Sequence, residues 1–276
     1  MRKPHTYWDE GIELVPGCTP CSQGCRYCWS AGMTHRFGDA ALTYIDPEYE
    51  VPRFTGKVVF HPDRLTRFNK KKPTVFSIWN DLFHEDVAED FVKQSLGAAH
   101  QANQHTFLIL TKRPQRIIDY YSWCGECVPG SCASLVTLEV LDTYPNIYFG
   151  LTVCNQQEAD EKIPIFLQIP GKKFLSIEPM LGNINLAKFG IPDYMGDNSL
   201  SGHTITVYRF PIDAVILGCE TGSNARPISL ESVRCVVRQC EEMNVPLFIK
   251  ALTINGKPNH NIEQWPEDLR IRELAW

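Results

Sequence analysis

The chain of 276 residues lacks long apolar runs, and none approaches the roughly 18 residues that a membrane span requires. Its start also lacks the apolar stretch of a secretion signal, because a basic opening is followed by Trp8-Asp9-Glu10. A formal net charge of -5 argues against a protein coated throughout with basic groups for nucleic acid. Internal repeats and low-complexity tracts are missing as well. We therefore expect a cytoplasmic protein that does not enter a membrane.

A disulfide framework is also not expected. A chain of this length buries a sizeable core without covalent staples, and eleven cysteines leave at least one unpaired. In the reducing cytosol, clustered thiols serve as metal ligands or catalytic groups more often than as disulfides. The spacing of the cysteines should therefore indicate a site.

Short apolar runs rich in β-branched residues recur along the chain, with helix-like segments between them. This alternation is typical of a parallel α/β sheet, and the nearly continuous apolarity predicts strands that are buried on both faces. Apolar stripes after Glu85-Asp86 and after Ser229 predict two of the helices. We expect one domain over residues 1–276, a partial or complete (β/α) barrel. The expected strands are 12–15, 58–60, 74–78, 106–110, 147–151, 174–177, 214–217 and 246–249.

Two segments interrupt this alternation, near residues 119–145 and 188–211. The first contains three cysteines, and the second is rich in Gly, Ser, Asp and Asn, as surface excursions are. The C-terminal extension 251–276 has an Asn255-Gly256 turn and two tryptophans. We expect this tail to pack on the barrel instead of forming a second domain.

Polar side chains follow the apolar runs at the points where the strands are expected to end. In a βα barrel the carboxyl ends of the strands form the functional site, so these groups should converge on one mouth. They are His61, Asn80, Asp81, Lys112, Arg113, Thr152, Asn155, Glu178, Glu220 and Lys250. Loops are polar in any protein, so the repetition is what favours a site.

Four cysteines follow the first expected strand: Cys18, Cys21, Cys25 and Cys28. The last three have the spacing C-x3-C-x2-C, with the aromatic residue Tyr27 directly before the third. Three thiolates on one tight loop hold three irons of a cubane cluster and leave the fourth iron open to an external ligand. The four thiols together would instead suit a closed structural zinc site.

The triplet after a first strand resembles the signature of the radical SAM superfamily. This resemblance implies a TIM-like barrel and a [4Fe-4S] cluster whose open iron binds S-adenosylmethionine (SAM). It also implies a 5'-deoxyadenosyl radical that abstracts hydrogen, and it places Tyr27 near the adenine. By strand position, the other side chains expected at this cofactor are Ser77, Asn80 and Asp81 near its amino group and methionine moiety, and Thr152 and Asn155 near its ribose hydroxyls.

The resemblance covers most of the chain and extends to a branch of the superfamily that is common in bacteriophages and bacteria. The matching blocks are 17–19, 24–25, Cys28, 81–87, 105–107, 110–114, 178–182, 218–222, 225–227 and 248–250. The spacing of this branch, C-x6-C-x2-C, selects Cys18, Cys25 and Cys28 as ligands. The superfamily spacing selects Cys21 in place of Cys18, so Cys25 and Cys28 are ligands in both interpretations.

A second group of cysteines, Cys124, Cys127 and Cys132, lies in the first of the two interrupting segments. With the spare N-terminal cysteine or Cys154 as a fourth ligand, it would bind zinc or an auxiliary iron-sulfur cluster. Pairs with C-x2-C spacing also occur by chance in cysteine-rich chains. An ordinary insertion with free thiols is therefore the alternative.

Charged side chains at the expected strand ends are candidates for substrate binding and catalysis. Lys112 and Arg113 suit an anionic group, since a guanidinium binds carboxylate or phosphate through two hydrogen bonds. Glu178, Glu220 and Lys250 would share a dry cavity, where they would bind polar groups or transfer protons. The alternative for these three residues is a structural ion pair at the barrel mouth.

The phage-type resemblance implies an enzyme of DNA hypermodification in the host cytoplasm. The expected reaction isomerises a thymidine that carries glycine on its methyl carbon, from the nitrogen-linked to the carbon-linked form, and Lys112, Arg113 or Lys250 would hold the glycyl carboxylate. The partners would be DNA or a modified thymidine nucleotide as substrate, with the basic stretch 64–72 along a nucleic-acid backbone, and an electron donor such as flavodoxin. The alternatives are a radical SAM lyase that repairs thymine lesions in DNA and a non-catalytic zinc protein that binds nucleic acid.

Overall fold

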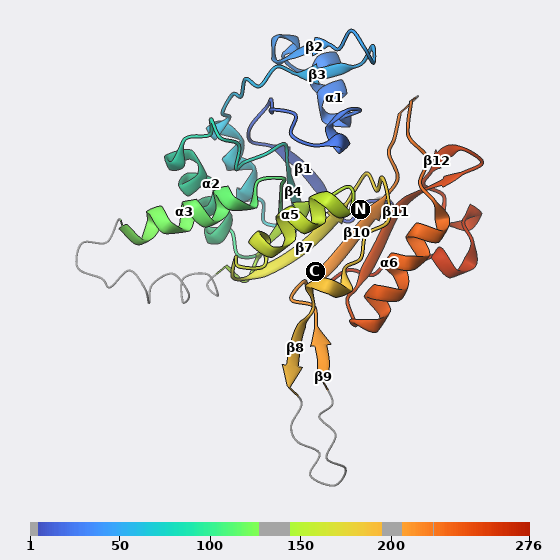
Figure 1. Ribbon diagram of the computed structural model, residues 1–276. Coiled ribbons are helices and arrows are strands. Elements are labelled where there is room, and N and C mark those ends of the chain that lie inside the picture. Colours follow the sequence, from blue (N-terminus) through green and yellow to red (C-terminus); the bar gives the residue numbers. More distant parts are fainter. Residues whose placement is uncertain (1–4, 127–143, 195–205, 223) are drawn as a thin grey trace.

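The computed structural model describes residues 5–126, 144–194, 206–222 and 224–276, and within them eight strands form one sheet that curls into a half-barrel (Figure 1). The strands, in spatial order, are β1 (Glu10–Glu13), β4 (Val75–Trp79), β5 (Thr106–Thr111), β6 (Ile147–Thr152), β7 (Lys172–Ile177), β10 (Ala214–Gly218), β11 (Leu247–Ile254) and β12 (Lys257–Asn259). Neighbours from β1 to β11 pair in parallel, and β12 is antiparallel to β11. The expected parallel α/β sheet with a partial barrel is confirmed.

One expected strand, 58–60, is wrong. Val58 makes only an isolated antiparallel bridge with Gly17, and Val59 and Phe60 are 41% and 37% exposed. The apolar run there is therefore a surface feature and does not reflect burial in the sheet. The first strand begins at Glu10 and ends at Glu13, two residues earlier than the apolar pattern indicated.

Four helices cover the convex face of the sheet (Figure 1). They are α2 (Glu89–Gln101), α3 (Pro114–Glu126), α5 (Gln156–Phe166) and α6 (Leu230–Glu242). Phe91 and Leu96 of α2 pack in the main core with Phe76 of β4. The Ser229 cap of α6 is confirmed, since its side chain accepts the backbone N–H of Ser232. These helices bury the apolar side chains that point outward from the strands.

The last residues of the chain pack against the sheet, on a cluster that includes Tyr148, Phe174 and Phe248. They run antiparallel to β11 through a bridge between Phe248 and Arg272. Trp276 then packs against the rings of Tyr148 and Phe174, at centroid distances of 5.2 and 5.5 Å, and its Nε1 donates to the carbonyl oxygen of Tyr7 at 2.9 Å. The expected extension 251–276 begins too early, since residues 251–254 belong to β11 and 257–259 form β12, and the last residues of the chain pack on the sheet.

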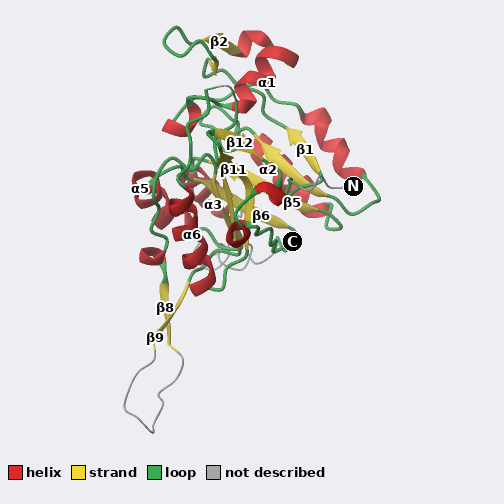
Figure 2. Cartoon of the chain, turned by 90° about the vertical axis from the view of Figure 1, so that its right-hand side faces the viewer, coloured by secondary structure: helices red, strands yellow, loops and turns green. Residues whose placement is uncertain are grey.

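Three shorter elements lie together beyond the end of β1: α1 (Trp29–Phe37), β2 (Thr43–Ile45) and β3 (Pro52–Phe54) (Figures 1 and 2). The expected excursion at 188–211 contains an antiparallel hairpin of β8 (Ile191–Tyr194) and β9 (Thr206–Arg209), which projects from the body of the protein (Figure 2). Across the described ranges, no helix combines the length and apolarity that a membrane crossing requires.

Candidate functional site

The cysteine-bearing loop leaves the carboxyl end of β1 and ends at the N-terminus of α1. Cys25 closes a short 3-10 turn, Gln23–Cys25, whose N-cap residue Ser22 accepts the backbone N–H of Gly24 at 3.2 Å. Cys28 occupies the N-cap position of α1. The loop thus lies where the carboxyl ends of the parallel strands converge, which is the usual position of functional sites in such sheets.

The four thiols of this loop interact electrostatically. A hydrogen bond from Cys21 lowers the pKa of Cys25 to about 4 against the opposing effect of burial, and the charge of Lys112 acts in the same direction. Burial raises the pKa of Cys18 to about 12, and the nearby thiols of Cys25 and Cys28 contribute to this rise. Cys21 is exposed and hydrogen-bonded to Cys25. Both candidates for the third ligand therefore lie close to Cys25, and the choice between them stays open.

The donor set of the loop fits an iron-sulfur cluster. Thiolates are the ligands that such clusters take from proteins, and a half-buried cation, Lys112, lies within electrostatic range of them. Among the residues described, no group of three or more His, Cys, Asp or Glu side chains is arranged to hold a metal ion.

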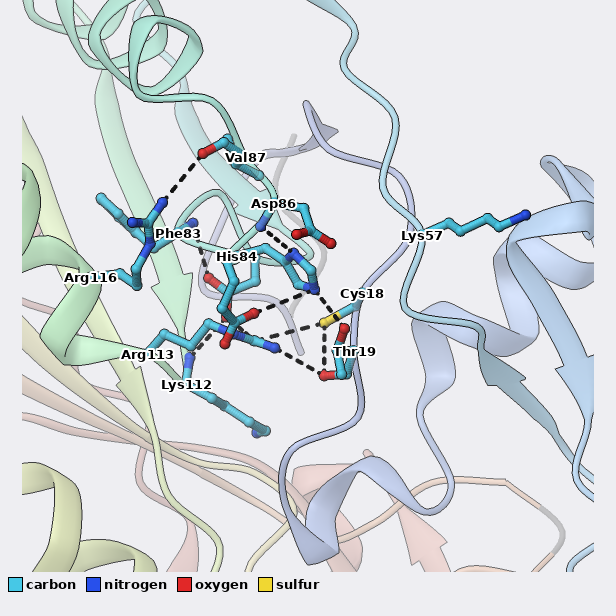
Figure 3. A network of polar contacts seen from close by, with 12 residues as sticks. Cys18, Thr19, Lys57, Phe83, His84, Asp86, Val87, Lys112, Arg113 and Arg116 are labelled. Carbon is cyan, nitrogen blue, oxygen red and sulfur yellow. Dashed lines mark hydrogen bonds and ion pairs between the residues drawn. The ribbon is translucent and has the colours of Figure 1, made fainter.

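Arg113 ties the cysteine loop to the ends of β4 and β5 (Figure 3). The buried carboxylate of Asp81 accepts hydrogen bonds from Arg113 at 2.8 Å and from Thr111 at 2.7 Å. Arg113 also donates to Glu85 at 2.7 Å and to the carbonyl oxygen of Thr19 at 3.1 Å. Burial opposes the charge of Arg113, but these carboxylates raise its pKa above the ordinary value. Asp81 and Arg113 therefore hold the cysteine loop in place. We had expected Asp81 to bind the cofactor and Arg113 to bind an external anion.

His84 holds the same part of the loop from the segment that follows β4 (Figure 3). Its Nδ1 accepts the backbone N–H of Asp86 at 3.1 Å, so Nε2 carries the proton and donates to Thr19 Oγ1 at 2.8 Å. Burial lowers the pKa of His84, and the charge of Arg113 lowers it further. The ring is therefore a neutral donor that fixes the residue after Cys18.

Asn80 joins β4 to β1 and to α1. Its backbone has a positive φ of 57°, and its Nδ2 donates to Glu13 Oε1 at 2.7 Å. Its Oδ1 accepts the hydroxyl of Ser30 at 2.5 Å, two residues after Cys28. The amide that we expected at the cofactor is thus used within the protein, while Ser77, also expected there, lies buried in β4.

Glu220, at the end of β10, acts through Arg226. The carboxylate of Glu220 is 3% exposed and accepts hydrogen bonds from Arg226 Nε at 2.8 Å and Nη2 at 2.5 Å. Arg226 Nη2 also donates to the carbonyl oxygen of Gln23 at 3.0 Å, and the guanidinium lies 5.5 Å from the ring centroid of Tyr27. Glu220 therefore orients an arginine on the cysteine loop, a role that depends on a residue the sequence reasoning did not select.

Glu178 and Lys250 meet at the mouth of the half-barrel, where Lys250 Nζ donates to Glu178 Oε1 at 2.5 Å. Both side chains are partly exposed. Burial raises the pKa of the nearby Tyr7, and the negative charge of Glu178 adds to this effect. Glu178 and Lys250 thus form the structural ion pair that was the alternative interpretation, and Glu220, expected to share a cavity with them, pairs with Arg226 instead.

The end of β6 borders the other side of the loop. Cys154 is fully buried, and Gly24 lies so close to its Sγ that a side chain on Gly24 would collide with it. Thr152 is buried, and Asn155 caps α5 by accepting the backbone N–H of Glu158 at 2.9 Å. The Asn-x-x-Glu pattern, typical of a helix N-terminus, would have revealed this cap, whereas no sequence signal reveals the contact of Cys154.

Most of the expected second metal site lies outside the described residues. Cys127, Cys132 and the side chain of Cys124 lie outside the described residues. Cys154, considered as a fourth ligand of that site, lies instead against the N-terminal cysteine loop.

The basic stretch 64–72 is largely compensated within the protein. Arg64 pairs with Glu13, and both Arg67 and Lys70 pair with Glu10. In the described structure, Lys71 and Lys72 are the exposed charges of this stretch that have no ion pair. This pairing weakens the stretch as a surface for a nucleic-acid backbone.

The fold and the site define an α/β half-barrel protein with a cysteine-bearing loop held at the carboxyl ends of its parallel strands. A family model described as "Protein of unknown function (DUF5131)" matches residues 5–262, and the chain therefore belongs to the DUF5131 family. No curated protein matches the chain. No solved structure matches it either.

Proposed function

We propose that this chain is a radical SAM enzyme that isomerises a glycyl-modified thymidine during phage DNA hypermodification in the host cytoplasm. The observation that supports this proposal is the arrangement of the cysteine loop, whose thiols interact with one another while several strand ends hold the loop in place. Cys25, Cys28 and either Cys18 or Cys21 would hold a [4Fe-4S] cluster, and Tyr27 would lie against the adenine of SAM.

When bound and reduced by a donor such as flavodoxin, the cluster and SAM would supply a 5'-deoxyadenosyl radical that removes hydrogen from the glycyl α-carbon. The isomerisation breaks the bond between the thymine methylene and nitrogen and one C–H bond of the glycyl α-carbon, and it forms a bond between the methylene and that carbon and one N–H bond, so atoms and electrons balance.

The residues of the chain would position the loop and the substrate. Arg113 and Arg226 fix the loop through the carbonyl oxygens of Thr19 and Gln23. Because Arg113 is engaged by carboxylates and Lys250 by Glu178, Lys112 is the remaining candidate for the glycyl carboxylate.

The test is anaerobic purification of the full chain, followed by reduction and incubation with SAM and glycyl-modified DNA. The proposal predicts formation of 5'-deoxyadenosine and a product nucleoside of unchanged mass but altered retention time. The Cys25→Ala variant is the control and should form neither product. An unchanged nucleoside in the wild-type reaction would exclude this substrate.

Two alternatives are decided by the same preparation. A radical SAM lyase would change the mass of thymine lesions in DNA and leave the glycyl-modified nucleoside intact. A zinc protein would be colourless, hold zinc in a fixed ratio to the chain, and form no 5'-deoxyadenosine.

A further inference from the structure

The exposed face of α1 carries large apolar side chains. Trp29, Met33 and Phe37 are spaced four residues apart, so they share one face of the helix, and they are 46%, 48% and 71% exposed. The buried side chains of the same helix are small: Ser30, Ala31 and Thr34. Helices of globular proteins normally bury their large apolar residues, so the reversed pattern of α1 indicates a surface that another molecule covers.

This face is held in a fixed position relative to the sheet. The ring of Trp29 packs against Trp79 at the end of β4, with the ring centroids 4.7 Å apart. The hydroxyl of Ser30 donates to Asn80 Oδ1 at 2.5 Å. α1 lies with β2 and β3 beyond the end of β1, outside the group of helices that covers the sheet (Figures 1 and 2). A surface that is ordered in advance binds a partner at a lower entropic cost.

The charges around this face are of one sign. No acidic residue occurs between positions 16 and 38, a stretch that contains the cysteine loop and α1. Arg36, in the last turn of α1, is exposed, has no ion pair within the described residues, and lies with its guanidinium 5.8 Å from the ring centroid of Phe37. Asp39, the next acidic residue, caps the following turn by accepting the backbone N–H of Ala41. An acidic partner would complement this face, whereas a second copy of the chain would bring two such cations together.

The size and composition of the face favour a transient protein partner. A stable dimer uses roughly 20–30 residues and about 800 Å² on each side, more than a helix of nine residues offers, whereas electron-transfer complexes have smaller interfaces. Trp, Met, Phe and Arg are enriched in protein–protein interfaces. A nucleic-acid backbone would instead need several cations along its path, and Arg36 is the one arginine or lysine of α1.

The same face adjoins the proposed cluster ligands. Cys28 is the N-cap residue of α1, and Trp29 follows it directly. Electron transfer slows exponentially with the distance between donor and acceptor, so a protein that reduces the cluster must dock near its ligands. Trp29 brings the exposed face of α1 within one peptide bond of such a ligand.

We propose that Trp29, Met33, Arg36 and Phe37 form the docking surface for a small acidic electron-carrier protein, which passes one electron to the cluster at Cys28. This inference rests on the proposed function, for which it names the point where the electron enters. In this step the carrier loses one electron and the cluster gains it, so the electrons balance without a further reagent.

The first experiment measures the dissociation constant of oxidised flavodoxin, an acidic electron carrier, for the anaerobically reconstituted chain by isothermal titration calorimetry. Met33→Ser and Phe37→Ser should each weaken binding by about tenfold, as truncation of a central interface side chain does. Arg36→Glu should weaken binding by a similar factor at low salt and by less at high salt, because salt screens the charge. Val59→Ser is the matched control, since Val59 is an exposed apolar side chain outside α1, and it should leave the constant within about twofold of wild type.

The second experiment compares two reductants in the formation of 5'-deoxyadenosine. Dithionite reduces a cluster without docking, whereas reduced flavodoxin must bind first. In the Met33→Ser/Phe37→Ser variant, the rate with limiting flavodoxin should fall by about tenfold or more, and the rate with dithionite should stay within about twofold of wild type. If dithionite gives no 5'-deoxyadenosine in the wild type, the proposed function fails. If dithionite works and the flavodoxin-dependent rate is unchanged in the variant, this inference alone fails.

The other outcomes would also overturn the inference. Flavodoxin that binds the wild type and the variants equally, or binds neither, would show that the carrier does not use this face. Equal loss of both rates would mean that α1 only positions the cysteine loop. A wild-type dimer that the variants convert to a monomer in sedimentation would assign the face to a second copy. Weaker DNA binding with unchanged flavodoxin binding would assign it to nucleic acid.

Discussion

Substitution of Gly24 by alanine should dislodge the cysteine loop. A Cβ on Gly24 would lie less than 3.0 Å from Cys154 Sγ and 3.2 Å from Pro179 Cδ, and real Cβ atoms essentially never come as close as the first of these distances. Cys154 is fully buried and has a single side-chain torsion, so its sulfur cannot withdraw without moving β6 or the loop. Overpacking of this kind costs about 1–3 kcal/mol.

The assay is urea unfolding together with iron content after anaerobic reconstitution. Gly24→Ala should lower the free energy of unfolding by about 1–3 kcal/mol and reduce bound iron, because the displaced turn carries Cys25. The double variant Gly24→Ala/Cys154→Ala should recover much of both losses, since removal of the sulfur makes room for the methyl group. Gly97→Ala is the control, because nothing lies within 4 Å of the added methyl and alanine favours the helix by about 1 kcal/mol. Wild-type stability in Gly24→Ala, or no rescue by the second substitution, would refute the reasoning.

Three other consequences are open to direct measurement. Arg226→Gln leaves the buried Glu220 carboxylate without its cation and should cost about 3 kcal/mol of unfolding free energy in urea titrations, with partial recovery when Glu220→Gln is added. In the metal-free chain Cys25 should be a thiolate at pH 6, since its pKa is lowered to about 4. Alkylation at that pH should therefore modify Cys25 first, as detected by mass spectrometry. Cys21→Ala should suppress this modification, because the hydrogen bond from Cys21 lowers the pKa of Cys25. Equal modification of all thiols would contradict this prediction. Deletion of Trp276 removes ring contacts with Tyr7, Tyr148 and Phe174 and should cost about 1–3 kcal/mol, visible as a lower thermal midpoint, whereas an unchanged midpoint would show that the tail does not stabilise the half-barrel.

The strands of the sheet could be predicted from the sequence because the central strands are buried on both faces. Side chains on both faces of β5 and β6 contribute to the cores, so their apolar runs have few interruptions and stand out against polar loops. The same signal failed at residues 58–60, since exposed Val59 and Phe60 give an apolar run without a sheet. Hydrophobicity alone does not distinguish a buried run from an exposed one.

The location of the candidate site could also be predicted, but the roles of individual residues could not. Of the polar groups at the strand ends, Arg113 contacts the cysteine loop directly, and Asp81 and Glu220 act on the loop through Arg113 and Arg226. Arg113 and Glu220, however, contact residues that the sequence reasoning did not select, Glu85 and Arg226, and these contacts depend on how the loops fold. The position of Cys154 against Gly24 likewise arises only when β6 and the loop are brought together.

The most direct test of the central claim is the metal content of the anaerobically purified chain, combined with electron paramagnetic resonance after reduction. We expect iron and sulfide in equal amounts and a signal that changes when SAM is added. Cys25→Ala should lose this signal, and comparison of Cys18→Ala with Cys21→Ala identifies the third ligand. A colourless chain that holds zinc and no iron, or a reduced signal that SAM does not alter, would contradict the account.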